Sequence, residues 1–232
     1  KRGRVYWYLA FLPLIFIVWY LFTHLPSSGV NIYVANEGDG TISVISQQSL
    51  KVLETIQLAG MPHNVNVDPL GRYIFATNHE GEEEEAEDPH AHHQPYVRII
   101  DAKKNKVIRS IPMEEMAAHV VPSRDGAQLY VSLEGSNLIK EINLNTFAIT
   151  RTFTVGQGPH GFVLNNKNTL LYVPNMKSYD LSIVDLETGR EERIPITHEE
   201  HSCKTPVAAG ITRDDQHVIV TCGASFDMYK ID

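Results

Sequence analysis

The sequence lacks the residue patterns on which several common classes of protein depend. Its only cysteines are Cys203 and Cys222, too few for a disulfide scaffold and too far apart for a CxxC redox or zinc motif. It contains no glycine-rich phosphate loop, no GxSxG nucleophile elbow and no HExxH motif. Positive charge is scarce, with 20 Lys and Arg against 28 Asp and Glu, a formal net charge of −8. The sequence therefore shows none of these catalytic motifs, and its negative charge leads us to expect no nucleic acid partner.

Charge is missing altogether from residues 5–22, VYWYLAFLPLIFIVWYLF. A helix of this length, at about 1.5 Å per residue, nearly crosses a hydrocarbon core of about 30 Å. Aromatic residues lie at both ends of the run and the cationic KRGR precedes it, as in membrane helices. A cleaved signal peptide is the alternative, but its apolar region would be shorter and no A-x-A site follows. We expect a cytoplasmic tip, a transmembrane helix and a short linker over residues 1–28, with the rest facing the periplasm or cell exterior from the inner membrane.

A phrase recurs along the remaining chain. MPHNVNVDPLGRYIFATN (61–78) and GPHGFVLNNKNTLLYVPN (158–175) both run from a Pro-His pair to a closing asparagine with the same spacing. TPVAAGITRDDQHVIVTC keeps that spacing, with Val207 in the histidine position. AAHVVPSRDGAQLYVSL is one residue shorter, so Ala118 rather than His119 best occupies the position. NIYVAN is the second half of a further copy, and the closing positions are residues 36, 78, 133, 175 and 222.

Each copy predicts four short strands. Two β-rich runs surround a turn, as in VNVD and YIFAT around PLG, and two more runs follow, such as YVRIID and KVIRSIPM. Four strands in a unit of about 42 residues are the signature of a β-propeller, and no 3.6-residue pattern supports a helical solenoid. We therefore expect an all-β fold over residues 29–232, a β-propeller with about five four-stranded blades.

The motifs PHG, PHN, LYVS, LYVP, FATN and VRIID resemble the YVTN-type β-propeller repeat. The resemblance covers nearly all of residues 30–232 and implies seven blades. It says little about activity, because similar proteins include surface, scaffold and cofactor-associated proteins.

The ring of blades is expected to be incomplete. The chain enters at a second strand (31–36) and leaves at a third (225–232), so the first blade lacks its inner strand and the fifth its outer strand. Because propellers avoid raw edges, we expect further chain after Asp232 or coverage by another subunit.

Two insertions fall at the same end of the blades, and both contain histidine. The first, after Asn78, is HEGEEEEAEDPHAHHQP. Its histidines and carboxylates suit a transition metal, although a solvated, mutually repelling loop is the alternative. The candidate ligands there are His79, His90, His92 and His93.

The second insertion, THEEHSCKT, precedes Pro206. His198, His201 and Cys203, with Cys222 on the paired strand, are candidate ligands for copper or zinc. A Cys203–Cys222 disulfide and two unpaired cysteines are the alternatives.

His63, His160 and, if a bulge absorbs its one-residue shift, His119 start first strands near the predicted central axis. These residues are candidate cofactor ligands, because the propellers of haem d1 nitrite reductases and nitrous oxide reductases are similar and use histidines. This chain departs from them, since Ala118 and Val207 interrupt the ring of histidines and no CxxCH motif occurs. The alternative is a set of turn histidines that bond backbone groups between blades.

These observations favour a binding or scaffold protein, a single-pass accessory subunit of a membrane complex whose acidic face meets a partner. The rival hypothesis is a redox or cofactor-maturation protein that binds a metal or haem d1 through its histidines. A surface adhesion protein is a third possibility. The sequence specifies no cofactor: copper, zinc and no cofactor at all are the alternatives.

Overall fold

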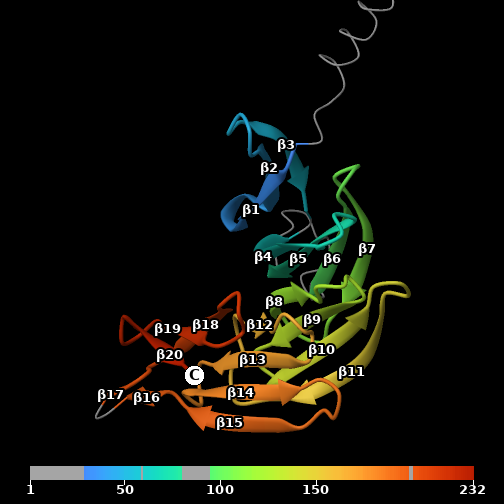
Figure 1. Ribbon diagram of the computed structural model, residues 1–232. Coiled ribbons are helices and arrows are strands. Elements are labelled where there is room, and N and C mark those ends of the chain that lie inside the picture. Colours follow the sequence, from blue (N-terminus) through green and yellow to red (C-terminus); the bar gives the residue numbers. More distant parts are fainter. Residues whose placement is uncertain (1–28, 59, 80–94, 199–200) are drawn as a thin grey trace, which may run out of the picture.

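The computed structural model describes residues 29–58, 60–79, 95–198 and 201–232 (Figure 1). In these ranges the chain is all-β, with strands in antiparallel sheets and no α-helix. The predicted transmembrane helix over residues 5–22 lies outside the described residues, and within them no helix has the length and apolar character needed to span a membrane.

Five sheets of three or four strands follow one another along the chain, with one additional two-stranded hairpin. Within every sheet the strands pair in sequence order, each antiparallel to the next. Figure 1 shows the sheets along a curve that runs from β1–β3 to β18–β20, a propeller-like arrangement. The strands are β1 (Asn31–Asn36), β2 (Thr41–Ser46), β3 (Val52–Gln57), β4 (Met61–Val67), β5 (Tyr73–His79), β6 (Tyr96–Asp101), β7 (Lys106–Pro112), β8 (Ala117–Pro122), β9 (Gln128–Leu133), β10 (Leu138–Asn143), β11 (Ala148–Thr154), β12 (Val163–Leu164), β13 (Leu170–Asn175), β14 (Asp180–Asp185), β15 (Glu191–Pro195), β16 (Thr197–His198), β17 (His201–Ser202), β18 (Pro206–Ile211), β19 (Val218–Cys222) and β20 (Asp227–Ile231).

The predicted strand order is confirmed in the described part of the chain. The three middle sheets have four strands each, whereas β1–β3 and β18–β20 have three. The first sheet begins at the strand that is second in the other sheets, and the last sheet ends at the third. One element was not predicted from the sequence. It is the short hairpin β16–β17, which is formed by the insertion before Pro206.

The turns between third and fourth strands use one repeated device. Asp101, Asn143 and Asp185 each end a third strand, and the Oδ1 of each accepts hydrogen bonds from backbone N–H groups two and three residues later. Short Asx side chains favour this local bonding and so end the strand at a defined residue. The same turn therefore begins the outer hairpin in each of the three four-stranded sheets.

The hydrophobic core lies between neighbouring sheets. Four separate clusters of buried side chains fill the spaces between consecutive sheets. Phe75 of β5, for example, packs with Val131 of β9, and both are fully buried. Each sheet therefore depends on its neighbours for burial, as the sequence repeat implies.

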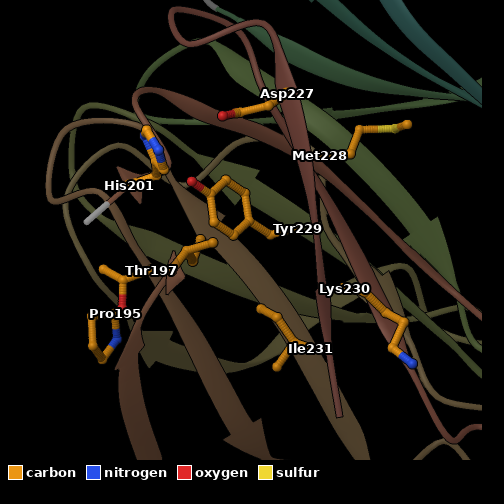
Figure 2. Close-up of a pocket in the computed structure, with 9 residues that line it drawn as sticks. Pro195, Thr197, His201, Asp227, Met228, Tyr229, Lys230 and Ile231 are labelled. Carbon is orange, nitrogen blue, oxygen red and sulfur yellow. The ribbon is translucent and has the colours of Figure 1, made fainter. Parts of the chain in front are cut away.

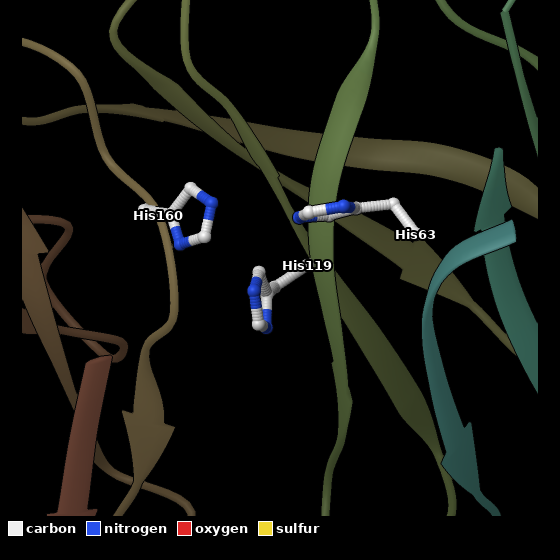
Figure 3. Close-up of side chains that lie close together, drawn as sticks. All are labelled: His63, His119 and His160. Atoms are coloured by element: carbon white, nitrogen blue, oxygen red, sulfur yellow. The ribbon is translucent and has the colours of Figure 1, made fainter. Parts of the chain in front are cut away.

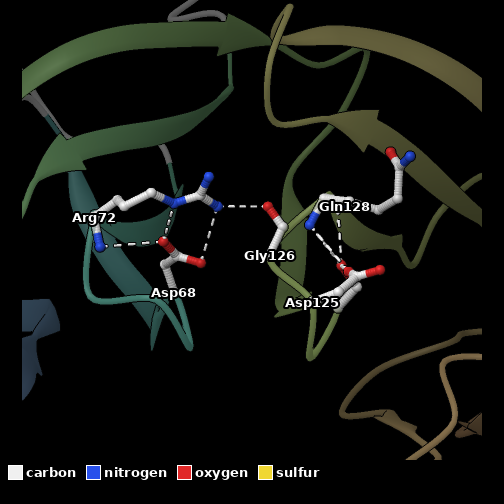
Figure 4. A network of polar contacts seen from close by, with 7 residues as sticks. Asp68, Arg72, Asp125, Gly126 and Gln128 are labelled. Atoms are coloured by element: carbon white, nitrogen blue, oxygen red, sulfur yellow. Dashed lines mark hydrogen bonds and ion pairs between the residues drawn. The ribbon is translucent and has the colours of Figure 1, made fainter.

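A polar contact also joins the second and third sheets (Figure 4). Arg72 donates to Asp68 (Nε to Oδ2, 2.6 Å) and to the carbonyl oxygen of Gly126 in the next sheet (2.5 Å). Gly126 has a φ of +68°, and a Cβ there would lie 2.6 Å from Arg72 Nη2. The approach of the two turns therefore requires glycine.

Candidate metal centre

The first histidine is placed by a β-bulge. In the pairing of β4 with β5, Pro62 faces Asn78 and Asn64 faces Thr77, which leaves His63 as an extra residue. The N–H of Asn64 donates to Thr77 Oγ1 at 3.1 Å. Bulges of this kind redirect a side chain. This bulge lies at the end of the sheet at which β5 ends.

The third sheet repeats the bulge with a different residue. The register of β8 on β9 shifts between Ala117 and Val120, so Ala118 and His119 together face Ser132. The N–H of His119 donates to Ser132 Oγ at 3.0 Å, as the residue after the bulged histidine does in β4. Ala118 therefore occupies the histidine position of the repeat, as the spacing predicted, and His119 follows it.

The three histidines converge on one place (Figure 3). The ring centroids of His63 and His119 are 5.6 Å apart, those of His63 and His160 are 5.6 Å apart, and those of His119 and His160 are 4.6 Å apart. One ring nitrogen from each lies within 4.8 Å of the other two. The rings come from three consecutive sheets, so packing of the sheets creates the cluster.

Two side-chain hydroxyls and one backbone N–H hold the strand starts that carry the histidines. Thr77 Oγ1 donates to the carbonyl of Ala118 at 3.0 Å, and Ser132 Oγ donates to the carbonyl of His160 at 2.9 Å. The N–H of His160 donates to Pro174 O at 3.2 Å. Thr77 and Ser132 occupy the same position in consecutive sheets and are fully buried, so a repeated hydroxyl joins each sheet to the next.

Hydrogen bonds also orient two of the imidazole rings. His160 Nδ1 lies 3.2 Å from the carbonyl oxygen of Val207, which can only accept, so Nδ1 carries the proton. His63 Nδ1 lies 3.2 Å from Glu37 Oε1. In both rings this bonding assigns the lone pair of the neutral tautomer to Nε2, the arrangement that metal-binding histidines adopt.

His119 is held in its neutral form by its surroundings. Burial, together with charge repulsion from the nearby His160 and His63, lowers its pKa from 6.5 to about 3. A neutral imidazole keeps the lone pair that a metal ion needs, whereas a proton would occupy it. The cluster is therefore suited to a cation and not to three protonated rings.

The second predicted metal site requires correction. Cys203 and Cys222 form a disulfide, one of the alternatives left open by the sequence, with Cα atoms 5.4 Å apart. Sulfur atoms bonded to each other are not thiolates, so neither cysteine is a metal ligand in this state. The remaining residue of that set with a described side chain, His201, is exposed.

His201 lines a groove of about 530 Å³ beside the last strand, together with Thr197 and residues 227–231 (Figure 2). None of the three clustered histidines lines this groove. The structure therefore does not bring His201 to the cluster.

The structure does not describe the side chains of the other predicted ligands. His79 ends β5 and His198 ends β16, and their side chains lie outside the described part of the structure. His90, His92 and His93 lie outside the described residues altogether.

Sequence reasoning missed Glu37 and the Val207 carbonyl. Glu37 directly follows Asn36, a closing position of the repeat, so it lies at the end of the sheet where the histidine positions begin. The position of Glu37 directly after a closing residue of the repeat could therefore have identified it from the sequence. No sequence signal identifies the Val207 carbonyl, because every residue has one.

Comparisons with known proteins support the all-β, propeller-like fold and do not indicate a function. No family model and no curated protein matches the chain. Among solved structures, hydrazine synthase of Kuenenia stuttgartiensis is similar, with a TM-score of 0.67 and 18% identity over 82% of this chain and 52% of that chain. A functionally unknown protein from Desulfotomaculum acetoxidans DSM 771 has a TM-score of 0.66 and 15% identity, over 87% of this chain and 65% of that one. The chain thus spans about half of the first protein and under two thirds of the second, and at these identities the likeness shows the fold alone. The fold and the site define an all-β, propeller-like protein with a three-histidine cluster.

Proposed function

We propose that the protein binds one divalent transition-metal ion, zinc or copper, through His63, His119 and His160. The observation that supports this proposal is the convergence of three ring nitrogens, from three sheets, to within 4.8 Å of one another. Neutral imidazole is a preferred ligand of both metals. At Zn–N distances of about 2.0–2.1 Å, tetrahedral ligand atoms lie roughly 3.3 Å apart, so binding would draw the rings together by on the order of 1 Å.

The cluster favours a single ion over haem d1. Axial haem ligands approach iron from opposite faces of a flat macrocycle. Three mutually close nitrogens suit three corners of one coordination sphere instead. This is why we place the metal-ion hypothesis ahead of the haem hypothesis.

Equilibrium dialysis followed by elemental analysis tests the proposal. The full chain is expected to retain one equivalent of zinc or copper, and His119→Ala is expected to lower the affinity by at least about tenfold. His217→Ala is the matched control, because His217 pairs with Asp232 in the last sheet. Unchanged affinity in both His119→Ala and His160→Ala would show that the metal, if bound, is held elsewhere.

We also propose that the sheets are blades of a YVTN-type β-propeller, carried on a membrane anchor formed by residues 5–22. The recurring Pro-His phrase and the uncharged apolar run support this assignment. The Cys203–Cys222 disulfide supports a periplasmic or extracellular location, because disulfides persist in oxidising compartments.

A role as an accessory subunit of a membrane complex is a second candidate function. It is supported by exposed apolar side chains on the two terminal sheets, among them Ile32 and Val34 on β1 and Phe226 and Met228 at β20. Exposed apolar groups of this kind are typical of surfaces that meet a partner. Purification of the full chain from detergent tests this role: a stoichiometric partner would support it, and a chain that always runs alone would contradict it.

A further inference from the structure

The segments that lead into β12 and β18 share one backbone arrangement. The carbonyls of Gly158 and Thr205 each accept a hydrogen bond at 2.8 Å from the N–H of the residue after the closing position of their sheet. The carbonyls one residue earlier, of Gln157 and Lys204, accept equivalent bonds at 3.0 and 3.1 Å. Thr205 therefore occupies the position that Gly158 has in the preceding sheet.

The disulfide takes the place of a noncovalent contact in that preceding sheet. Cys203 and Cys222 correspond by repeat position to Gly156 and Asn175. A Cβ at Gly156 would lie 2.4 Å from Asn175 Nδ2, so the two positions are already close in the fourth sheet. In the fifth sheet the two positions are joined covalently. The bond therefore fixes the start of the segment that leads into β18 to the end of β19.

The segment that the disulfide fixes contains a strained residue. Thr205 has a φ of +55°, and Gly158 at the equivalent position has a φ of +72°. Glycine adopts this left-handed region readily, whereas a β-branched residue there is an outlier that costs free energy. Such a conformation persists only where the surrounding structure imposes it. Cys203 lies two residues before Thr205, so the disulfide is a covalent restraint directly beside the strained position.

The same segment brings a carbonyl to the histidine cluster. The register of β18 on β19 shifts between Pro206 and Ala208, which leaves Val207 as a bulged residue. The carbonyl of Val207 accepts hydrogen bonds from Gly161 N–H at 2.8 Å and from His160 Nδ1 at 3.2 Å. The bond from Nδ1 favours the tautomer whose lone pair is on Nε2, the nitrogen that can then bind a metal.

We infer that the Cys203–Cys222 disulfide is a positioning element of the proposed metal site. The bond keeps Thr205 in its left-handed conformation and so holds the Val207 carbonyl against His160. This inference rests on the proposed function and names a control of the same site. Without the bond, Thr205 relaxes toward a negative φ, the carbonyl moves, and the imidazole loses its fixed tautomer. The disulfide therefore acts on metal affinity as well as on stability.

The metal affinity of the double variant Cys203→Ala, Cys222→Ala tests the inference on the full chain, with zinc and copper(II) titrated separately. Competition with a chromophoric chelator is expected to show binding about tenfold weaker than that of the wild type, as for the loss of other outer partners of metal-bound histidines. Alanine is used in place of chemical reduction because free thiolates would themselves bind the metal. Circular dichroism confirms that the variant remains folded.

Val220→Ala is the matched control. Val220 is fully buried in the same hydrophobic cluster as the two cysteines, so its truncation destabilises the last sheet but leaves the disulfide in place. This variant should bind the metal as the wild type does. Equal losses of affinity in Val220→Ala and in the disulfide-free variant would overturn the inference, because the effect would then follow stability alone.

Two further measurements separate positioning from stability. At a pH where imidazole is neutral, the nitrogen NMR shifts of the His160 ring should show the proton on Nδ1 in the metal-free wild type and a mixture of tautomers in the disulfide-free variant. Adding Thr205→Gly to that variant should restore most of the lost affinity, because glycine adopts this φ without steric cost, as Gly158 does. No recovery, or one unchanged tautomer in both proteins, would overturn the inference.

The remaining outcomes distinguish the inference from the proposal beneath it. Equal affinity in the wild type and the disulfide-free variant would overturn the inference and leave the proposed metal site intact. A wild type that binds neither zinc nor copper would overturn the proposed function and the inference with it.

Discussion

The rings of His119 and His160 lie with their centroids 4.6 Å apart, although His119 belongs to β8 and His160 precedes β12 in the next sheet. The link between the two sheets is Ser132, which accepts from the N–H of His119 and donates to the carbonyl of His160. One buried hydroxyl therefore sets the spacing of both residues. The cluster depends on contacts between sheets, and its properties can be tested through them.

Replacing Ser132 by alanine is expected to destabilise the protein and loosen the cluster. The variant leaves the part-buried N–H of His119 and the part-buried carbonyl of His160 without their partner, a cost of about 1–3 kcal/mol in the free energy of unfolding. Ser132→Thr should cost less than Ser132→Ala, because it keeps the hydroxyl and Thr77 makes the equivalent bonds in the preceding sheet. Urea unfolding measures both, and equal losses in the two variants would contradict the role of the hydroxyl.

Glu37→Gln is expected to weaken metal binding by about tenfold, because loss of an orienting carboxylate typically lowers metal affinity by about 10–100-fold. Its half-exposed side chain, at 49%, favours the lower end of that range. Glu134→Gln is the control, since Glu134 has the same repeat position in another sheet but pairs with Lys177. Competition titration with a chromophoric chelator gives both affinities. If the two variants lose the same affinity, the Glu37–His63 contact has no special role.

Lowering the pH is expected to destabilise the protein through His119. Its folded-state pKa is lowered to about 3, so between that value and 6.5 the unfolded state binds the additional proton. The free energy of unfolding therefore rises with pH through this window, by up to about 1.4 kcal/mol per pH unit. The contribution is fully present above the unfolded-state pKa and is lost as the pH falls toward the folded-state value.

His119→Asn should remove this component of the pH dependence. Urea unfolding of wild type and variant at several pH values in this window measures the difference in slope. NMR of the wild type gives a direct check, because the His119 ring signals should not titrate near neutral pH. Identical slopes in the two proteins would contradict the burial of a neutral ring.

Reduction of the Cys203–Cys222 disulfide is expected to lower stability by about 2–4 kcal/mol. The bond joins residues 19 apart in sequence, and both cysteines lie in the hydrophobic cluster between the last two sheets. Denaturant unfolding with and without a reductant measures the effect, with the Cys203→Ala, Cys222→Ala double variant as a control that the reductant should not alter. A wild-type midpoint that does not move on reduction would show that the bond is dispensable.

Gly126→Ala is expected to cost about 1–3 kcal/mol, because alanine at a φ of +68° is strained and its Cβ would meet Arg72 and Asp68. Gly38→Ala is the matched comparison, since a Cβ there meets nothing within 4 Å. Thermal unfolding distinguishes the two. Similar melting temperatures for both variants would argue against the tight approach of the two turns.

Much of the fold follows from local sequence pattern. The runs TISVIS and YVRIID became β2 and β6 with the predicted bounds, because β-branched and aromatic residues between turn formers specify strands locally. The hairpin β16–β17 was not predicted, since THEEHS has no such run. Its two-residue strands depend on the surrounding chain.

Only part of the histidine cluster could be predicted from the sequence pattern. His63 and His160 share a repeat position, so their proximity followed from any radial arrangement of the sheets. His119 lies one position later, and whether it joined them depended on the bulge between Ala117 and Val120. A bulge is decided by the pairing of two strands and is not written in either strand alone.

The sequence by itself determined the strands, their order and the end of each sheet at which the histidine positions lie, because these depend on local propensity and on a repeated spacing. Tertiary structure alone decided that Cys203 pairs with Cys222, that Glu37 meets His63, and that three rings from three sheets share one space. The physical reason is that Glu37 and the three histidines lie in different sheets, and only the packing of one sheet against the next fixes the distances between them. The disulfide depends instead on how the segment before β18 lies against the end of β19.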